Sequence, residues 1–244
     1  MSAPARPFLT SAAWDPDVRE RLEQLVAEPG DDAPVAAFDF DQTCAWGDVS
    51  ETLLRLLARD RGVDLVGEYE AACARDLRAG YVELVYTLIG GRTEREARAA
   101  AERALREGVD TIQLREPIRE LVWAMHRFGW QVWVVTASAE VLVQAAAERL
   151  GIHPHRVIGM RAPLDPSGRY RAEIVEPIPF RQGKLELLRR AIGRDPTFAA
   201  GDSRSDAWMM RAARHALLLD RGDEALRREM TDAGALIQPA EQIR

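Results

Sequence analysis

The sequence predicts an α/β protein built on a doubly wound parallel sheet, with a second, smaller domain that is all helical. Three short apolar runs have the composition of strands that are buried on both faces: residues 35–38 (VAAF), 130–135 (WQVWVV) and 198–200 (FAA). Amphipathic segments with helical spacing lie between them, and this alternation is typical of parallel βα units. Residues 46–115 show helical periodicity alone, which predicts an inserted helical domain.

Local signals locate further elements. Asp15 followed by Pro16 is typical of a helix N-terminus, so residues 1–30 are expected to form an irregular arm and a helix. Thr93 and Glu96 have the spacing of a capping box and predict a helix start within the insertion. The predicted organisation is an α/β core over residues 1–45 and 116–244, a helical domain over 46–115, a hairpin turn at 165–168 and a helix over 182–192.

The composition argues against several classes of partner. The 244 residues carry a formal net charge of −6 and contain no basic run, so neither a nucleic acid nor a membrane is expected to bind. No apolar segment has the length of a membrane span or of a signal-peptide core, and a cytoplasmic location is expected. The two cysteines, Cys44 and Cys73, give no disulfide framework and no metal-ligand spacing. No feature indicates an oligomeric state.

The first buried run ends in two aspartates, Asp39 and Asp41. Strand residues i and i+2 point the same way, and ligand sites in open α/β sheets lie beyond the carboxyl ends of the strands. Two carboxylates that share a small site repel each other unless a cation lies between them, and Mg²⁺ suits oxygen ligands of this kind. Taken alone, the pair has another interpretation, an acidic turn that caps the next element.

Three more polar features follow at comparable places. Thr136 ends the second apolar run, with Ser138 nearby as a rival hydroxyl donor. Lys184, in the first turn of a predicted helix, is the only lysine among the 33 basic residues. Asp202 and Asp206 follow the third run. Each alone has a structural alternative: a strand-end threonine, a solvated surface lysine, or a turn that caps a helix.

The four motifs, FDFDQT, VVTAS, RQGK and GDSRSD, together resemble those of the haloacid dehalogenase (HAD) superfamily of phosphatases, in order and in structural context. The resemblance covers about residues 35–219 and implies a Rossmann-like core. It also implies a phosphomonoesterase that works through an aspartyl-phosphate intermediate. Asp39 would be the nucleophile, and Asp41 would protonate the leaving alkoxide and then deprotonate water.

The resemblance assigns the other motif residues as well. Thr136 would donate a hydrogen bond to one phosphate oxygen, and Lys184 would place a compact positive charge on another. Mg²⁺ would be held by the Asp39 carboxylate, the backbone carbonyl of Asp41 and Asp202. Asp206 would bind the ion through water or support its ligands.

Several alternatives stay open from the sequence. A phosphotransferase would use the same intermediate with an acceptor alcohol in place of water. A catalytically silent HAD-like module would bind a partner or sense phosphate, and it would be free to lose Asp41 or Lys184, both of which are present. Dehalogenation is disfavoured by Asp41, because a halide leaving group needs no proton donor.

The insertion at 46–115 lies between the first and second motifs, where the resemblance implies a helical cap of the C1 type. Such a cap closes over the site and contacts the leaving group, which implies a small soluble phosphomonoester. The chain looks most like the phosphoserine-phosphatase branch, which includes phosphocholine and phosphoethanolamine phosphatases. Asp48 occupies the position where phosphoserine phosphatases carry an acidic residue that binds the substrate amine. Gln42 and the TAS sequence at 136–138 depart from that branch.

Trp46, Asp48 and Glu51 also suggest an aromatic and acidic pocket for a substituted ammonium group. In the alternative interpretation, Trp46 packs at the hinge of the cap and Asp48 caps the helix that begins near Val49. The predicted substrate-binding residues are Thr43, Trp46, Asp48 and Ser138. Three tyrosines are expected in the core of the cap: Tyr69, Tyr81 and Tyr86.

Overall fold

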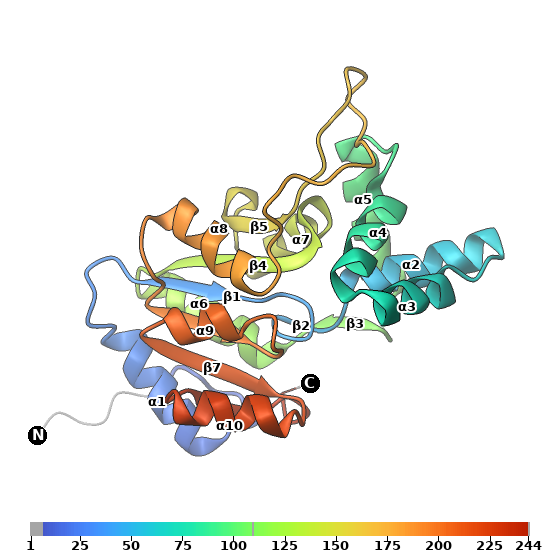
Figure 1. Ribbon diagram of the computed structural model, residues 1–244. Helices are drawn as coiled ribbons and strands as arrows, with labels where there is room; N and C mark the ends of the chain where they lie inside the picture. Colours follow the sequence, from blue (N-terminus) through green and yellow to red (C-terminus); the bar gives the residue numbers. More distant parts are fainter. Residues whose placement is uncertain (1–6, 109, 244) are drawn as a thin grey trace, which may run out of the picture.

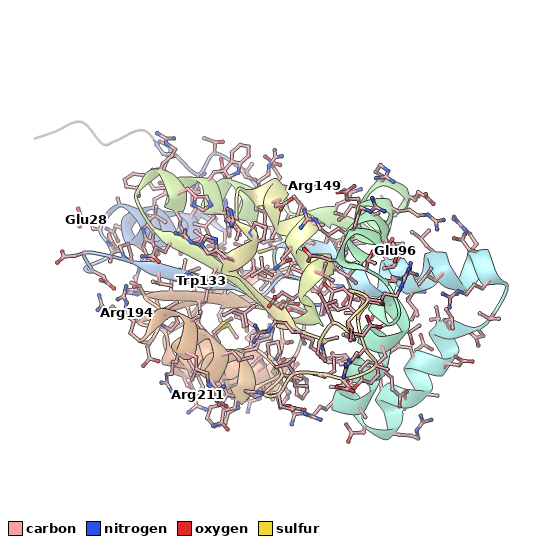
Figure 2. The ribbon with its side chains drawn as sticks, turned by 90° about the horizontal axis from the view of Figure 1, so that it is seen from above. Glu28, Glu96, Trp133, Arg149, Arg194 and Arg211 are labelled. Carbon is pink, nitrogen blue, oxygen red and sulfur yellow. The ribbon has the colours of Figure 1, made fainter. Side chains whose placement is uncertain are left out.

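The computed structural model describes residues 7–108 and 110–243. An α/β core and a group of four helices lie side by side, and the first and last described elements, α1 (Pro16–Ala27) and β8 (Leu236–Pro239), both belong to the core (Figure 1). Seen from above, Glu28 and Arg194 lie at the end of the core that is far from this group of four helices, whereas Glu96 lies within the group (Figure 2). We call this group the helical insertion. Its helices are α2 (Val49–Arg61), α3 (Leu65–Arg75), α4 (Leu77–Ile89) and α5 (Glu94–Glu107).

The core is a six-stranded, fully parallel sheet. Its strands run in the spatial order β5 (Val157–Met160), β4 (Gln131–Ala139), β1 (Val35–Phe38), β6 (Phe198–Gly201), β7 (His215–Asp220) and β8 (Leu236–Pro239). The chain passes from β1 to β4 and β5 on one side, and then crosses to β6 on the other side of β1. This reversal creates a switch point beyond the carboxyl ends of β1 and β6, where ligands bind in folds of this class.

Helices cover both faces of the sheet. Successive strand residues point to opposite faces, so Ala36 and Phe38 pack in one hydrophobic cluster and Ala37 in another. The first cluster includes residues of α1 (Pro16–Ala27), α6 (Glu116–Arg127) and α7 (Glu140–Ala147). The second includes residues of α8 (Gln182–Ile192), α9 (Ala207–Ala212) and α10 (Glu224–Asp232). Two 3₁₀ turns, Glu148–Leu150 and Pro154–Arg156, connect α7 to β5. The predicted α/β fold class is confirmed.

The local signals are confirmed where they can be checked. Asp15 caps α1 by accepting hydrogen bonds from the backbone N–H groups of Asp17 and Val18, and Thr93 and Glu96 form the predicted capping box at α5. Strand β4 continues to Ala139, beyond the predicted end of the second apolar run. Strand β8 was not predicted. No helix among residues 7–108 and 110–243 is long and apolar enough to cross a bilayer.

A two-stranded antiparallel ribbon connects the insertion to the core, where the sequence predicted helices alone. Strand β2 (Ala45–Gly47) enters the insertion and β3 (Ile112–Leu114) leaves it. Strands of three residues are too short to give a periodic signal, which explains why they were missed.

A long loop from the core forms a second connection to the insertion. It runs between β5 and α8 and reaches toward α5 (Figure 1). At its predicted turn, the N–H of Gly168 donates to the carbonyl of Asp165 at 2.9 Å. Tyr170 then exchanges two backbone hydrogen bonds with the turn before α5: its N–H donates to the carbonyl of Arg92 at 2.8 Å, and its carbonyl accepts from Gly91 at 2.9 Å.

The ribbon gives a test of how tightly the insertion is joined. Gly47 has φ +89°, and a Cβ there would lie 1.8 Å from the carbonyl oxygen of Thr111. Gly47→Ala should therefore lower the free energy of unfolding by clearly more than the ~1–2 kcal/mol that a left-handed conformation costs an L residue, measured by urea denaturation. Gly62→Ala is the matched control, because Gly62 has φ +67° with open space around a Cβ. Equal losses in the two variants would contradict the close approach at Thr111.

Candidate active site

Asp39 follows β1 directly and is held at the switch point by backbone and side chain. Its N–H donates to the carbonyl of Ala200 at 2.9 Å, which extends the pairing of β1 with β6. Its carboxylate is buried, and Oδ1 accepts a hydrogen bond from Nζ of Lys184 at 2.6 Å. Burial raises the pKa of Asp39, and the positive charge of Lys184 opposes that rise. Lys184 therefore favours the charged carboxylate that a nucleophile requires.

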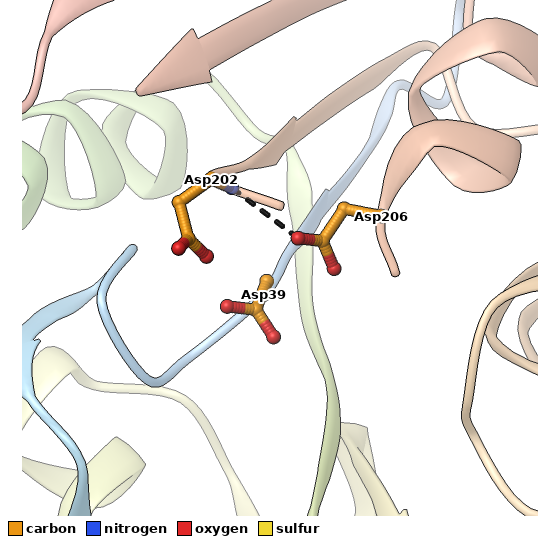
Figure 3. Close-up of side chains that lie close together, drawn as sticks. All are labelled: Asp39, Asp202 and Asp206. Carbon is orange, nitrogen blue, oxygen red and sulfur yellow. Dashed lines mark hydrogen bonds between the residues drawn. The ribbon is translucent and has the colours of Figure 1, made fainter. Parts of the chain in front are cut away.

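Asp206 folds back over the turn that follows β6. Its Oδ2 accepts a hydrogen bond from the N–H group of Asp202 at 3.2 Å (Figure 3). The same oxygen accepts from the N–H group of Ser203 at 3.0 Å and from Oγ of Ser203 at 2.8 Å. A Cβ on Gly201 would lie 2.4 Å from the Cβ of Asp206, so glycine is needed for this close approach. Oδ1 of Asp206 accepts from Nζ of Lys184 at 2.6 Å.

Lys184 lies between Asp39 and Asp206 with only 2% of its side chain exposed. Burial alone would lower its pKa, but the charges of the two aspartates raise the pKa above the ordinary lysine value, so the amine stays charged. The backbone before it is unusual. A Cβ on Gly183 would lie 2.0 Å from the carbonyl oxygen of Ile178, and Arg181 has a positive φ of 52°. Strained backbone of this kind clusters at functional sites.

The acidic groups fit a hard divalent cation. One carboxylate oxygen each from Asp39, Asp202 and Asp206 lie within 4.8 Å of one another. These three carboxylates contact two cations: Lys184 is bonded to Asp39 and Asp206, and Arg221 is bonded to Asp202. The remaining negative charge and the all-oxygen donors are what Mg²⁺ prefers in proteins. Both oxygens of Asp206 already have partners, which suits it to supporting the other carboxylates.

Asp202 is oriented from two sides. Its Oδ1 accepts from the hydroxyl of Thr43 at 3.2 Å, and its Oδ2 accepts from Nη1 of Arg221 at 2.8 Å. Burial raises the pKa of Asp202, with a further contribution from the charge of Asp206. Thr43 is fully buried against this carboxylate and is not among the residues that line the cavity described below.

Asp41 is held by the core and by the helical insertion together. Oδ2 accepts from the hydroxyls of Ser138 at 2.7 Å and Thr136 at 3.4 Å, both at the end of β4. Oδ1 accepts from the N–H of Val49 at 2.9 Å, which is the first residue of α2. Burial raises the pKa of Asp41, while these hydrogen bonds lower it. A carboxyl group with opposing influences of this kind is suited to exchange a proton.

The backbone after Asp41 is fixed by the ribbon and by a buried arginine. Gln42 has φ 65°, its N–H donates to the carbonyl of Gly47 at 3.0 Å, and its carbonyl accepts from Nε of Arg115 at 3.3 Å. Arg115 is 2% exposed and also donates to the carbonyls of Ala240 at 2.6 Å and Ile243 at 3.0 Å. The C-terminal segment is thereby connected to the turn that carries Asp41.

The side chains surround a cavity of about 270 Å³ between the core and the insertion. It is lined by Asp39, Asp41, Gln42, Asp48, Ser50, Glu51, Tyr69, Tyr81, Leu84, Val85, Thr136, Ala137, Ser138, Lys184, Asp202, Ser203, Ser205 and Arg221. The structure thus brings most of the residues predicted from sequence to one place. Trp46 lies in β2 and is not in this lining, and Asp206 lies behind Lys184. Asp48 lines the cavity and also caps α2 by accepting from the N–H of Glu51 at 2.8 Å.

Some lining residues were missed or misplaced by the sequence analysis. Tyr69 and Tyr81 were expected in the core of the insertion, but both line the cavity while packing against the hydrophobic core. Helical spacing groups such residues on one face and does not say what that face meets. Arg221 directly follows β7, and the short apolar run at 216–219 just before it is the signal in the sequence that could have identified it.

A parallel sheet with buried carboxylates and a buried lysine at its switch point defines a class, that of α/β proteins with an inserted helical domain and an acidic site whose ligands could hold a cation. The model of the family "HAD: haloacid dehalogenase-like hydrolase" matches residues 36–211, and the chain belongs to this family. No curated protein matches the sequence.

Solved structures agree on the fold. A functionally unknown protein from Anaerococcus prevotii has a TM-score of 0.76 at 15% identity, over 93% of this chain and 92% of that one. A protein of unknown function from Bordetella pertussis has a TM-score of 0.71 at 18% identity, over 85% and 99%. A substrate-bound phosphoserine phosphatase has a TM-score of 0.60 at 19% identity, over 86% and 95%. The sequence-based prediction of a HAD-type phosphatase with a phosphoserine-phosphatase-like fold is thus confirmed for the family and for the fold.

Arg115 offers a test of the support beneath the site. Arg115→Met should leave two buried carbonyls and one part-buried carbonyl without this donor, and each buried group costs about 1–3 kcal/mol. We expect the free energy of unfolding to fall by about 3 kcal/mol or more, measured by urea denaturation. Arg190→Met is the matched control, since Arg190 is exposed and forms a surface pair with Glu186 worth less than about 1 kcal/mol. If Arg115→Met lowered the free energy of unfolding no more than Arg190→Met does, Arg115 would not be a stabilising contact beneath the site.

Proposed function

We propose that the protein is a Mg²⁺-dependent phosphomonoesterase that hydrolyses a small phosphorylated metabolite through an aspartyl-phosphate on Asp39. The observation that carries this proposal is the placement of three groups at one cavity. They are a buried carboxylate paired with the only lysine of the chain, a second carboxyl held by two hydroxyls, and an acidic cluster suited to a divalent cation. Phosphoryl transfer depends on such positioning and on neutralising the charge of the phosphoryl oxygens.

The chain's own residues account for the two half-reactions. Asp39 attacks phosphorus, a new bond forms between its carboxylate oxygen and phosphorus, and the bond from phosphorus to the alcohol oxygen breaks. Asp41 gives its proton to the departing alkoxide and then accepts a proton from water. The water oxygen forms a bond to phosphorus, the bond from phosphorus to the Asp39 oxygen breaks, and inorganic phosphate leaves with the Asp39 carboxylate restored. Lys184 stays charged throughout and stabilises the phosphoryl oxygens, and Thr136 and Ser138 supply hydroxyl donors at the same edge.

Mg²⁺ would be held by Asp39, the backbone carbonyl of Asp41 and Asp202, with Asp206 in support. When bound, the ion supplies positive charge to the transferring phosphoryl group. Thr43 and Arg221 orient the Asp202 carboxylate for this role.

The helical insertion acts as a cap in this proposal, and residues 46–115 remain its proposed extent. Its residues line one side of the cavity, where the leaving alcohol would lie. A cavity of about 270 Å³ suits a small ester that is phosphoserine-, phosphocholine- or phosphoethanolamine-like. The negative net charge supports a small-molecule substrate over a nucleic acid, and a cytoplasmic location remains part of the proposal.

The nucleophile can be tested with p-nitrophenyl phosphate in the presence of Mg²⁺. Asp39→Asn should lower kcat by roughly 10³-fold or more, because the amide cannot form the covalent intermediate. Asp195→Asn, at an exposed ion pair with Arg189, is the control and should keep its activity. Both variants are checked for folding by circular dichroism. Activity near the wild-type level in a folded Asp39→Asn variant would remove Asp39 from the role of nucleophile.

The metal site has a separate test. Asp202→Asn should raise the Mg²⁺ concentration for half-maximal activity by roughly tenfold or more, because a neutral amide binds a hard cation more weakly. Wild-type activity should vanish with EDTA and return when Mg²⁺ is added in excess. An unchanged Mg²⁺ dependence in Asp202→Asn would show that a metal, if needed, is held by other residues.

A further inference from the structure

The side of the cavity formed by the helical insertion is acidic. It consists of Asp48, Ser50, Glu51, Tyr69, Tyr81, Leu84 and Val85, and residues 48–85, all described by the structure, contribute no basic side chain to it. The basic groups among the described lining residues are Lys184 and Arg221. Lys184 contacts Asp39 and Asp206 at 2.6 Å, and Arg221 contacts Asp202 at 2.8 Å. Both cations thus face the phosphoryl end of the cavity.

Ser50 provides an independent observation at the acidic side. It is 1% exposed, and its Oγ has no hydrogen-bond partner among residues 7–108 and 110–243. Buried hydroxyls are rarely left unpaired, because they lose their bonds to water without a replacement. Ser50 lines the cavity beside Asp48 and Glu51. An N–H donor on a bound ligand would satisfy this hydroxyl and face the two carboxylates at the same time.

The two tyrosines add no charge to this side. Burial raises the pKa of Tyr81 to about 12 and also raises the pKa of Tyr69, so both phenols stay neutral near neutral pH. The ring of Tyr81 is fixed by an edge-on contact with Phe180, with centroids 5.6 Å apart. Asp48 and Glu51 are therefore the acidic groups that a leaving group meets on this side. Burial and the charges of Asp41 and Glu51 raise the pKa of Asp48, and a cation bound beside it would favour its charged form. Glu51 has one weak partner, Arg55 at 3.7 Å, on the solvent-exposed surface.

From this geometry we infer that the leaving group is a small alcohol that carries a cationic nitrogen with N–H groups and no carboxylate. This inference rests on the proposed function and narrows its substrate to an amino-alcohol phosphate. Hydrolysis would then give inorganic phosphate and the free amino alcohol, with Asp41 supplying the proton to the alcohol oxygen. A serine-type leaving group would place its carboxylate against Asp48 and Glu51, where none of the described lining residues from the insertion is basic and the pairing of Arg55 with Glu51 at 3.7 Å lies on the solvent-exposed surface.

The first test compares four esters with wild-type enzyme and Mg²⁺: ethanolamine phosphate, 2-hydroxyethyl phosphate, phosphoserine and phosphocholine. The first two differ in one group, ammonium against hydroxyl. We expect kcat/KM for ethanolamine phosphate to exceed that for 2-hydroxyethyl phosphate by about 10²-fold, the worth of a charge-assisted hydrogen bond at such a site. Phosphoserine should be disfavoured by a similar factor, and phosphocholine should be slower than ethanolamine phosphate because it has no N–H donor.

The second test uses the ratio of kcat/KM between the ammonium ester and the hydroxyl ester. Asp48→Asn keeps a side chain that caps helices and removes the charge, and Glu51→Gln removes the other charge. Each should lower the ratio about tenfold. Glu102→Gln, on the exposed face of α5, is the control and should leave the ratio at the wild-type value.

Ser50→Ala separates a binding role from a structural one. Removing an unpaired buried hydroxyl should raise Tm, because no hydrogen bond of the folded protein is lost. If Ser50 accepts from the substrate ammonium, the same change should lower the ratio several-fold. A variant with an unchanged ratio would exclude Ser50 from the subsite.

The outcomes distinguish the inference from the proposed function. Hydrolysis of p-nitrophenyl phosphate and the neutral ester without any preference for ammonium would overturn the inference and leave the phosphatase proposal standing. A preference for phosphoserine would also overturn it. If no ester is hydrolysed with Mg²⁺, including p-nitrophenyl phosphate, the proposed function fails and the inference fails with it.

Discussion

The contact of Lys184 with Asp39 and Asp206 is the interaction on which the rest of the site depends. Burying two carboxylates and an amine is costly, and breaking such a group by removing one member costs about 3–5 kcal/mol. The chain arranges three elements to make this contact possible: β1 delivers Asp39, the first turn of α8 delivers Lys184, and the turn after β6 returns Asp206. The glycines at 183 and 201 allow the close backbone approaches that the arrangement needs. The sheet order follows the same requirement, since β1 and β6 must be neighbours.

Much of this site could be predicted from sequence, for physical reasons. Asp39, Thr136 and Asp202 follow buried apolar runs, and the carboxyl ends of parallel strands meet at one edge. Lys184 was singled out because it is the only lysine. Arg221 was missed because arginine is common throughout the chain, so its residue type carries no information and only its place after β7 could have identified it. The tyrosines of α3 and α4 were misplaced because periodicity identifies a shared face without identifying its neighbour.

The insertion takes part in the geometry of the core. The Asp41 carboxyl accepts from Ser138 on β4 and from the first N–H of α2, so its position depends on both parts of the chain. The turn that follows it is bonded to Gly47 in the ribbon and to Arg115 beyond the ribbon. The same segments that connect the insertion therefore hold the proposed acid and base. Because of these shared contacts, a change in the position of the insertion relative to the core would also change the alignment of Asp41 with Asp39.

The burial of Lys184 also has a practical consequence for chemistry on the intact protein. Because no other lysine exists in the chain, the folded state presents no accessible side-chain amine to acylating reagents. Unfolding exposes one such amine, at a known position in the site. The extent of acylation at Lys184, measured by peptide mapping, would therefore report how far the active site has opened. No other side-chain amine would contribute to the signal.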